Sequence, residues 1–392
     1  MTFITDEQKS ALLERFLRYV RIWTTSDSAA ADKGIQPSTQ RQSDLARVLA
    51  DELRQFGLSD VQITDHCYVY ARLDATDAGV SEPFCLLAHM DTVEECSGQN
   101  VNPQLTHKDG DTIISTDGTT LLGADDKAGV AEIMQTLSFL CSHPEIKHGT
   151  VEVCFSPDEE TGHGMDNVPL TLIRSKQAYT VDGGNMSELE TECFNAYKSE
   201  VKFTGVATHT GTARGKMVNA VTMASRFVSL LPQNEAPETT DGMEGFFAPM
   251  DISGTIESSS VTVFLRDFTT EGMERRKNLI DQTAQTVALT SGGCVQVNHV
   301  FQYANMKEGL KKSPSTVQNL IKAYKNAGLE PVFPPIRGGT DGSRLTELGI
   351  PTPNIFTGGH NFHSKAEWAS LNEMSKTLEV LINLCTQNSL EG

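Results

Sequence analysis

Residues 84–91 read FCLLAHMD, an apolar run that ends in a histidine and an aspartate. Its length and apolar character predict a buried strand. The runs VEVCFSPDEE at 151–160 and AYTVDGG at 178–184 repeat this arrangement, and a helical pattern at about 127–142 separates them from the first. This alternation is typical of an α/β fold with a largely parallel central sheet. Open α/β sheets bind ligands at the carboxyl ends of their strands, so the polar residues that end these runs are candidates for a site.

The flanking sequence predicts two domains. Amphipathic patterns predict helices at about 6–21 and 41–56, and the runs VQITDH and VYARLD predict further strands. From about residue 195 the pattern changes to four strands and two helices, which predicts an inserted α+β lid domain. The helix and strand alternation then resumes through PNIFTG to a last helix near 371–387. We therefore expect a catalytic domain of residues 1–194 and 308–392, interrupted by a lid domain of residues 195–307.

Composition excludes several classes of partner. The formal charge of the 392 residues is −19, which argues against nucleic acid or an anionic membrane surface as a partner. The sequence contains no apolar run of the roughly 20 residues that a membrane span requires. The amino-terminal residues lack the features of a secretory signal, and the eight cysteines form no CxxC pair, so they read as reduced core residues. A cytoplasmic protein is expected.

Two motifs at the start of the chain contain possible metal ligands. After the first strand, His89 could bind a metal while Asp91, two residues on, accepts the other imidazole proton. An ordinary hydrogen-bonded histidine is the alternative. In GADDKAGVAEIM, Asp125 could reach a cation, and the alternative is an aspartate that caps a helix.

Three further motifs complete the set. The run FSPDEETGHG ends a strand with Asp158, Glu159 and Glu160, and adjacent carboxylates repel one another unless solvent or a cation neutralises them. Asp182 ends the strand in TVDGG, and the glycine-rich GGHNFHSK contains His360 and His363. Taken together, one histidine and one aspartate after separate strands, a central aspartate, paired glutamates and a distant histidine form the ligand set expected for two zinc ions bridged by a carboxylate.

At this point the sequence resembles a known family, the co-catalytic zinc peptidases and deacylases, which include aminopeptidases, carboxypeptidases and acetylornithine deacetylase. The resemblance runs through CSGQNVNPQ, ISTDGTTLLGADDKAGVAEIM, PDEETGHG, PIRGGTDG and FTGGHNFHSK, and it is closest to the tripeptide aminopeptidases of the family. It implies that His89 and Asp182 bind one zinc ion, that Glu160 and His363 bind the other, and that Asp125 bridges the two.

The same resemblance implies further roles. Asp91 would orient His89, Glu159 would be the general base, and the peptide bond between Asp125 and Asp126 would be cis. Replacing Glu159 should then stop the chemistry without releasing zinc.

The lid domain would grip the substrate. By resemblance, its candidate residues are His209, Asn219 and Arg266, while Arg337 in PIRGGTDG would reach the peptide carboxylate from the catalytic domain. The loop after His209 lacks the proline that the tripeptide aminopeptidases have there, and HSKAEW stands where they have HGKHEF.

The expected activity is therefore hydrolysis of the N-terminal peptide bond of short peptides, above all tripeptides, by an enzyme with two zinc ions per subunit. A deacylase that acts on N-acyl amino acids is the alternative within the family, and a metal-binding protein without catalysis is the alternative from another class. A homodimer is possible, since some relatives use the lid as an interface.

Overall fold

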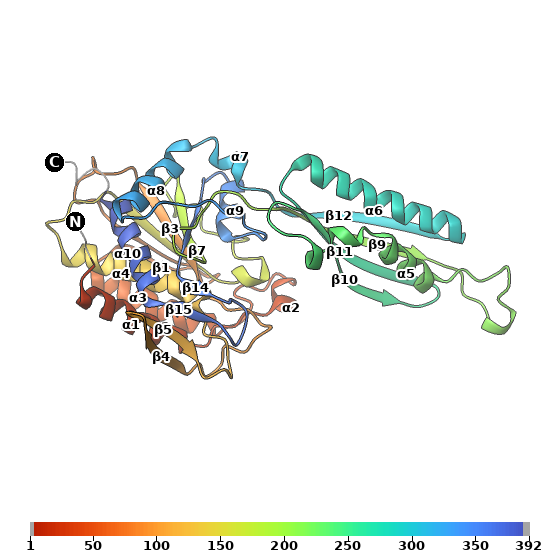
Figure 1. Ribbon diagram of the computed structural model, residues 1–392, viewed down its shortest axis with the longest axis horizontal. Helices are drawn as coiled ribbons and strands as arrows, with labels where there is room; N and C mark the ends of the chain where they lie inside the picture. The colour runs from red at the N-terminus through yellow and green to blue at the C-terminus, as the bar shows by residue number, and fades with distance from the viewer. Residues whose placement is uncertain (1–3, 387–392) are drawn as a thin grey trace. The chain divides into compact units, whose positions relative to one another are not determined.

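The computed structural model describes residues 4–386 and divides into two units (Figure 1). The larger unit takes in the described parts of Met1–Thr191, Met306–Pro334 and Thr340–Gly392. The smaller unit consists of Glu192–Asn305 and Pro335–Gly339. Arg337 thus belongs to the smaller unit, whereas the sequence analysis placed it in the catalytic domain.

A seven-stranded mixed sheet forms the centre of the larger unit, in the order β1-β2-β6-β3-β7-β13-β8. Its strands are β1 (Ser59–Ile63), β2 (Val69–Leu73), β3 (Phe84–His89), β6 (Val151–Ser156), β7 (Ala178–Gly183), β8 (Leu189–Glu190) and β13 (Asn354–Phe356). The neighbours β6, β3, β7 and β13 pair in parallel, while β1, β2 and β8 add antiparallel edges. The predicted fold class is confirmed, with the parallel pairing confined to the middle of the sheet.

Both faces of this sheet are buried, which explains why β3 is apolar from Phe84 to Ala88. Leu86 and Ala88 belong to a large core cluster with residues of α1, α3, α4, α8 and α10, whereas Cys85 and Leu87 pack on the other face with Leu345 of α9. The helices are α1 (Asp6–Val20), α2 (Ser28–Ala31), α3 (Gln42–Phe56), α4 (Ala124–Ser142), α7 (Lys307–Leu310), α8 (Pro314–Asn326), α9 (Asp341–Glu347) and α10 (Leu371–Cys385), with the 3-10 turn η1 (Glu159–Thr161).

The larger unit contains a second sheet that the sequence analysis did not predict. It has four strands in the order β14-β15-β5-β4. They are β4 (Pro103–Lys108), β5 (Asp111–Thr116), β14 (Gly359–His360) and β15 (Trp368–Ser370). Because β4 is largely exposed and β14 and β15 are very short, none of them has an apolar periodicity that sequence could reveal.

The smaller unit is an antiparallel sheet packed against helices. The sheet has the order β10-β11-β9-β12. Its elements are β9 (Asn195–Thr204), β10 (Phe246–Gly254), β11 (Ser258–Asp267), β12 (Cys294–Tyr303), α5 (Ala220–Leu230) and α6 (Thr270–Ser291), with the 3-10 turns η2 (Thr210–Thr212), η3 (Gln233–Glu235) and η4 (Pro237–Thr239). Its own core includes Phe203, Phe227, Val263 and Ile280, which are all fully buried. The four strands and two long helices match the expected α+β composition.

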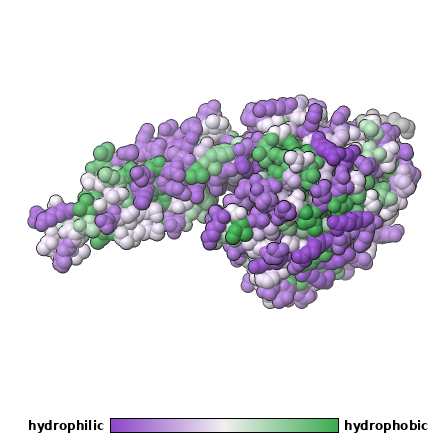
Figure 2. All heavy atoms as spheres, turned by 180° about the vertical axis from the view of Figure 1, so that it is seen from behind, coloured by the Kyte–Doolittle hydropathy of each residue, from purple (hydrophilic) through white to green (hydrophobic). Residues whose placement is uncertain are grey.

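The surface is mainly polar. Figure 2 shows hydrophilic side chains over most of the visible face, with hydrophobic residues in small groups. Among residues 4–386, no helix is both long and apolar enough to cross a membrane. All eight cysteines are free, and Cys294 alone is classed as exposed.

One buried acid makes a test of stability possible. Glu132 lies fully buried in α4, and neither of its carboxyl oxygens has a hydrogen-bond partner among residues 4–386. Burial raises its pKa well above the usual range, so the folded chain keeps this proton at pH values where the unfolded chain releases it. Above a pH of about 4.3, Glu132 should therefore cost about 1.4 kcal/mol of stability per pH unit until its folded pKa is reached.

The Glu132→Gln variant removes this titration, so its stability relative to wild type should increase as the pH rises from 5 to 8. Urea unfolding at several pH values and one metal concentration measures this difference. The exposed Glu14→Gln variant of α1 is the control and should show no such trend. A difference between Glu132→Gln and wild type that stays constant with pH would contradict the prediction.

Candidate metal centre

The carboxyl ends of the parallel strands converge on one group of polar side chains. His89 ends β3, Asp182 lies near the end of β7, and the turn η1 follows β6. The remaining members come from the start of α4 and from the loop between β14 and β15. The residues brought together are His89, Asp125, Glu159, Glu160, Asp182 and His363.

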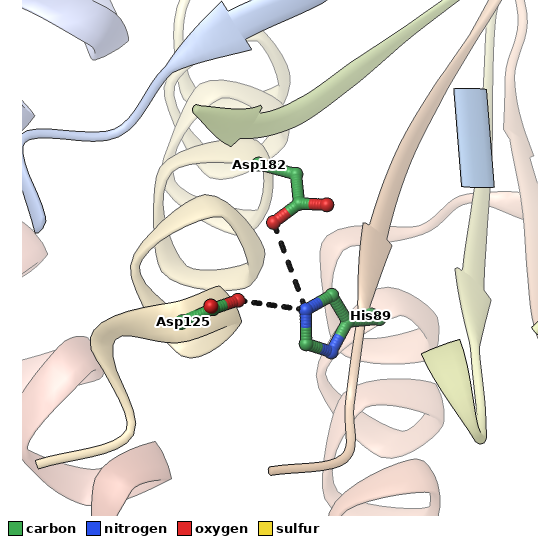
Figure 3. Close-up of side chains that lie close together, drawn as sticks. All are labelled: His89, Asp125 and Asp182. Carbon is green, nitrogen blue, oxygen red and sulfur yellow. Dashed lines mark hydrogen bonds and ion pairs between the residues drawn. The ribbon is translucent and has the colours of Figure 1, made fainter. Parts of the chain in front are cut away.

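A first cluster surrounds the buried imidazole of His89 (Figure 3). Its Nε2 atom lies 2.9 Å from Asp125 Oδ1 and 3.6 Å from Asp182 Oδ1. The other ring nitrogen, Nδ1, lies 3.4 Å from Asp91 Oδ1 and 3.2 Å from the Asp91 carbonyl oxygen. Asp91 therefore lies where an outer residue could orient a metal-binding histidine, and this role of Asp91 stays a prediction.

A second cluster shares Asp125 with the first. His363 Nε2 lies 3.2 Å from Asp125 Oδ2 and 3.0 Å from Glu160 Oε2. In each cluster the candidate ligand atoms lie within 4.8 Å of one another. The two oxygens of Asp125 therefore point to different clusters, which is the geometry of a bridging carboxylate.

The chemistry of these donors fits divalent metal ions. Glu160 Oε1 is buried without a hydrogen-bond partner in the described part of the chain, a costly state that a cation would relieve. Burial raises the pKa of Glu160 to about 8, and the nearby Asp125 carboxylate adds to the effect. Burial likewise raises the pKa of Asp182 to about 6. Carboxylates gathered this closely need a cation if all are to be ionised at neutral pH, and the mixed imidazole and carboxylate donors suit zinc and similar metals.

The start of α4 separates the roles of two adjacent aspartates. The backbones of Asp125 and Asp126 are not helical, and the peptide bond between them is cis, as expected. Asp126 accepts hydrogen bonds from the Gly129 and His89 amides, so it takes the structural role at the helix start. The Asp125 carboxylate is thereby left to face the two histidines. A side chain at Gly129 would meet the Val181 carbonyl oxygen at 1.8 Å, so the glycine allows α4 to approach β7 closely.

The acidic turn after β6 is anchored from two sides. Asp91 accepts hydrogen bonds from the Glu159 and Glu160 amides, at 3.0 and 3.2 Å. Asp158 points the other way, accepting from the amide and hydroxyl of Ser38 and from Gln42 Nε2. The turn is therefore no exposed acidic loop. Asp158 is part of the fold, whereas Glu160 belongs to the second cluster and Glu159 precedes it in the same turn.

The four candidate substrate-binding residues all lie in the smaller unit. His209 is exposed, and Asn219 caps α5 by accepting from the Val221 and Thr222 amides. Arg266 donates to Gln302 Oε1 and two carbonyl oxygens, while Asp267 pairs with Arg276 instead.

The guanidinium of Arg337 donates to the carbonyl oxygens of Thr240, Gly242 and Glu244 and to the Thr240 hydroxyl. It thus holds the 240–244 loop within the smaller unit. Substrate binding by His209, Asn219, Arg266 and Arg337 stays a prediction.

Two buried carboxylates near the clusters were missed in the sequence analysis. Glu367 accepts backbone hydrogen bonds from the loop before Asp125, and Asp341 accepts one from the Ser156 hydroxyl at the end of β6. Asp341 stands in PIRGGTDG and Glu367 in HSKAEW, but the spacing within these motifs does not indicate a role for either acid. Both come from segments more than 180 residues distant from their partners, so only the fold brings them together.

Comparison with known proteins identifies the family of the chain. The model of Peptidase family M20/M25/M40 matches residues 85–387, and the chain belongs to this family. Within it, the chain is 44% identical to Peptidase T of Clostridium perfringens strain SM101, over 95% of this chain and 97% of that protein.

Solved structures show the same fold. Aminopeptidase PepT from Bacillus cereus superposes with a TM-score of 0.78 at 24% identity, covering 97% of this chain and 99% of that one. A tripeptidase from Staphylococcus aureus superposes with a TM-score of 0.81 at 22% identity, covering 96% and 98%.

Proposed function

We propose that this chain is a dinuclear metallo-aminopeptidase that removes the N-terminal residue from short unblocked peptides, above all tripeptides. The observation that carries the proposal is the shared Asp125 carboxylate, with one oxygen in each of two His and carboxylate clusters. The close relative named Peptidase T and the likeness to a tripeptidase support the substrate class.

In this proposal His89, Asp182 and Asp125 hold one divalent ion, and Asp125, Glu160 and His363 hold the other. Zinc is the metal that we propose, because a mixed set of imidazoles and carboxylates with a histidine oriented by Asp91 suits it. Two ions bound there would polarise the scissile carbonyl and lower the pKa of the attacking water.

Glu159 is the proposed general base. Its backbone amide is fixed by Asp91, which holds the residue beside both clusters. Burial raises the pKa of its carboxyl well above the usual range. His89 opposes this rise, whereas Asp182, Asp341 and Glu160 add to it. A group with a raised pKa is a stronger base once it is ionised, and it can hold the proton of the attacking water until the leaving amine takes it. The positive charge of bound ions would keep Glu159 ionised before the reaction.

The substrate class is tested by the rate of amino acid release from four peptides of matched sequence: a dipeptide, a tripeptide, an N-acetylated tripeptide and a tetrapeptide. The zinc-loaded wild type should release the N-terminal residue fastest from the free tripeptide. It should leave the acetylated peptide uncut, because recognition of an N-terminal amine is part of the proposal. Preference for the acetylated peptide would favour the deacylase alternative, and hydrolysis of none would favour a metal-binding protein without catalysis.

Two further expectations accompany the proposed function. We expect the protein to reside in the cytoplasm, because a reducing compartment would keep its eight cysteines free. The homodimer stays a prediction, which light scattering of the purified chain would test.

A further inference from the structure

The carboxylate of Glu367 connects two parts of the metal centre that are far apart in sequence. It is 2% exposed, and it accepts hydrogen bonds from three backbone amides of the loop that precedes α4. The amides of Leu122 and Gly123 each donate to Oε2 at 2.7 Å, and the amide of Asp125 donates to Oε1 at 3.1 Å. Three backbone amides thus converge on one buried carboxyl group, which fixes the backbone of the proposed bridging ligand.

Glu367 also belongs to the segment that carries the other ligand. His363 lies four residues earlier in the loop between β14 and β15, which pair through Gly359 with Ala369 and His360 with Trp368. The loop is closed internally, since Ser364 Oγ donates to the Asn361 carbonyl oxygen and Asn361 Nδ2 donates to that of Ala366. Because Glu367 and His363 lie in the same small loop, a displacement of Glu367 would also displace His363.

We infer that Glu367 is a positioning residue that sets the Asp125 carboxylate at the correct distance from His363, so that the second metal ion is held by a preformed site. This inference rests on the proposed dinuclear function. The second cluster depends on Glu367 more than the first does. Glu367 accepts from the Asp125 amide and shares a loop with His363. In the first cluster, by contrast, His89 and Asp182 are fixed by strands β3 and β7. His363 is also the more exposed histidine, with 48% of its side chain accessible against 2% for His89.

The Glu367→Gln variant tests the inference with little change of shape. A glutamine has one acceptor oxygen, so it cannot replace both the oxygen that accepts from the Leu122 and Gly123 amides and the oxygen that accepts from the Asp125 amide. Its NH₂ group would then face an amide donor. The number of bound ions would be measured by elemental analysis after dialysis at buffered free zinc, without any substrate. The cobalt-loaded protein would give an absorption spectrum that reports ligand geometry.

Wild type should bind two ions. Glu367→Gln should keep the first and bind the second about 10- to 100-fold more weakly, the usual effect of removing an outer hydrogen-bonding partner from a metal site. Its cobalt spectrum should change, and its peptidase activity should return as the metal concentration is raised.

The matched control is Glu152→Gln. Glu152 is 1% exposed, lies in β6, and accepts hydrogen bonds from the Arg174 and Ser175 amides and the Tyr70 hydroxyl. Its replacement should lower the melting temperature but leave metal binding and the cobalt spectrum unchanged. A Glu367→Gln variant that binds its second ion as tightly as wild type, with the same spectrum, would overturn the inference.

If Glu367→Gln does not fold, the Glu367→Asp variant takes its place. It keeps the charge but shortens the side chain by one methylene, so it too should weaken the second ion, and unchanged binding would overturn the inference. A wild-type chain that binds only one ion would instead refute the dinuclear function, which keeps the two failures distinguishable.

Discussion

Replacement of Glu159 by glutamine is expected to lower kcat for tripeptide hydrolysis by about 100- to 10,000-fold, the range that positioned general bases contribute. The variant should still bind two metal ions, because Glu159 belongs to neither ligand cluster. The Asp91 carboxylate holds the backbone amide of Glu159 rather than its side chain, so this anchor survives the substitution. Steady-state kinetics and elemental analysis of the same preparation measure both effects.

The adjacent Glu160 provides the control. It lies in the same turn but within the second cluster, 3.0 Å from His363 Nε2. Glu160→Gln should lose metal at concentrations that saturate wild type, and its activity should improve when metal is added. Glu159→Gln should not respond to added metal. If the two variants behaved alike, or if Glu159→Gln kept the wild-type rate, the assignment of the base would be wrong.

Sequence could predict those parts of the fold for which the residues of a single segment indicate the structure. The β3 run is apolar because both of its faces are buried, and His89 interrupts it where the strand reaches the site. The same holds for the strands that end at Asp182 and before Glu159. Each of these side chains is placed by its own strand, so a pattern read along the chain suffices to find it.

Other features depend on partners far apart in sequence. Nothing near Glu367 shows that it meets residues 122–125, since the two segments are brought together by the second sheet, in which β14 pairs with β15 and β15 pairs with β5. Strand β4 is exposed on nearly every residue, so it has no alternating pattern. Arg337 was assigned to the wrong unit for a related reason. Its segment follows catalytic-domain sequence, but its hydrogen bonds are to the 240–244 loop.

Three-dimensional contacts also show which acid of a motif makes the structural hydrogen bonds. A capping role for Asp125 is a reasonable reading of GADDKAG, because an aspartate does take the structural position at the start of α4. That aspartate is Asp126, which accepts from the Gly129 amide. Similarly, one of the three acids in PDEE is structural, and Asp158 is that residue. In each case a motif contains one acid for the fold and its neighbour for the site, which spacing alone cannot separate.

The Asp125→Asn variant should lose both metal ions, and this is the largest effect on metal binding that we expect from one substitution. Each cluster uses a different oxygen of Asp125, and an asparagine offers only one oxygen and no charge. Burial would raise the pKa of Asp125, but its hydrogen bonds with His363 and His89 more than offset burial and hold the pKa below its usual range. Affinity for each ion should fall by more than the roughly 10- to 100-fold expected for an outer residue such as Glu367.

The Asp182→Asn variant is the control, because it distinguishes a ligand of one ion from a carboxylate that bridges two. Asp182 belongs to the first cluster only, so its replacement should weaken one ion and leave the other in place. Titration of each metal-free variant with zinc, followed by calorimetry, would give two sites for wild type, one strong site for Asp182→Asn and none for Asp125→Asn. If Asp125→Asn retained one ion with wild-type affinity, Asp125 would be a ligand of a single metal, and the mechanism proposed for this enzyme would need only one ion.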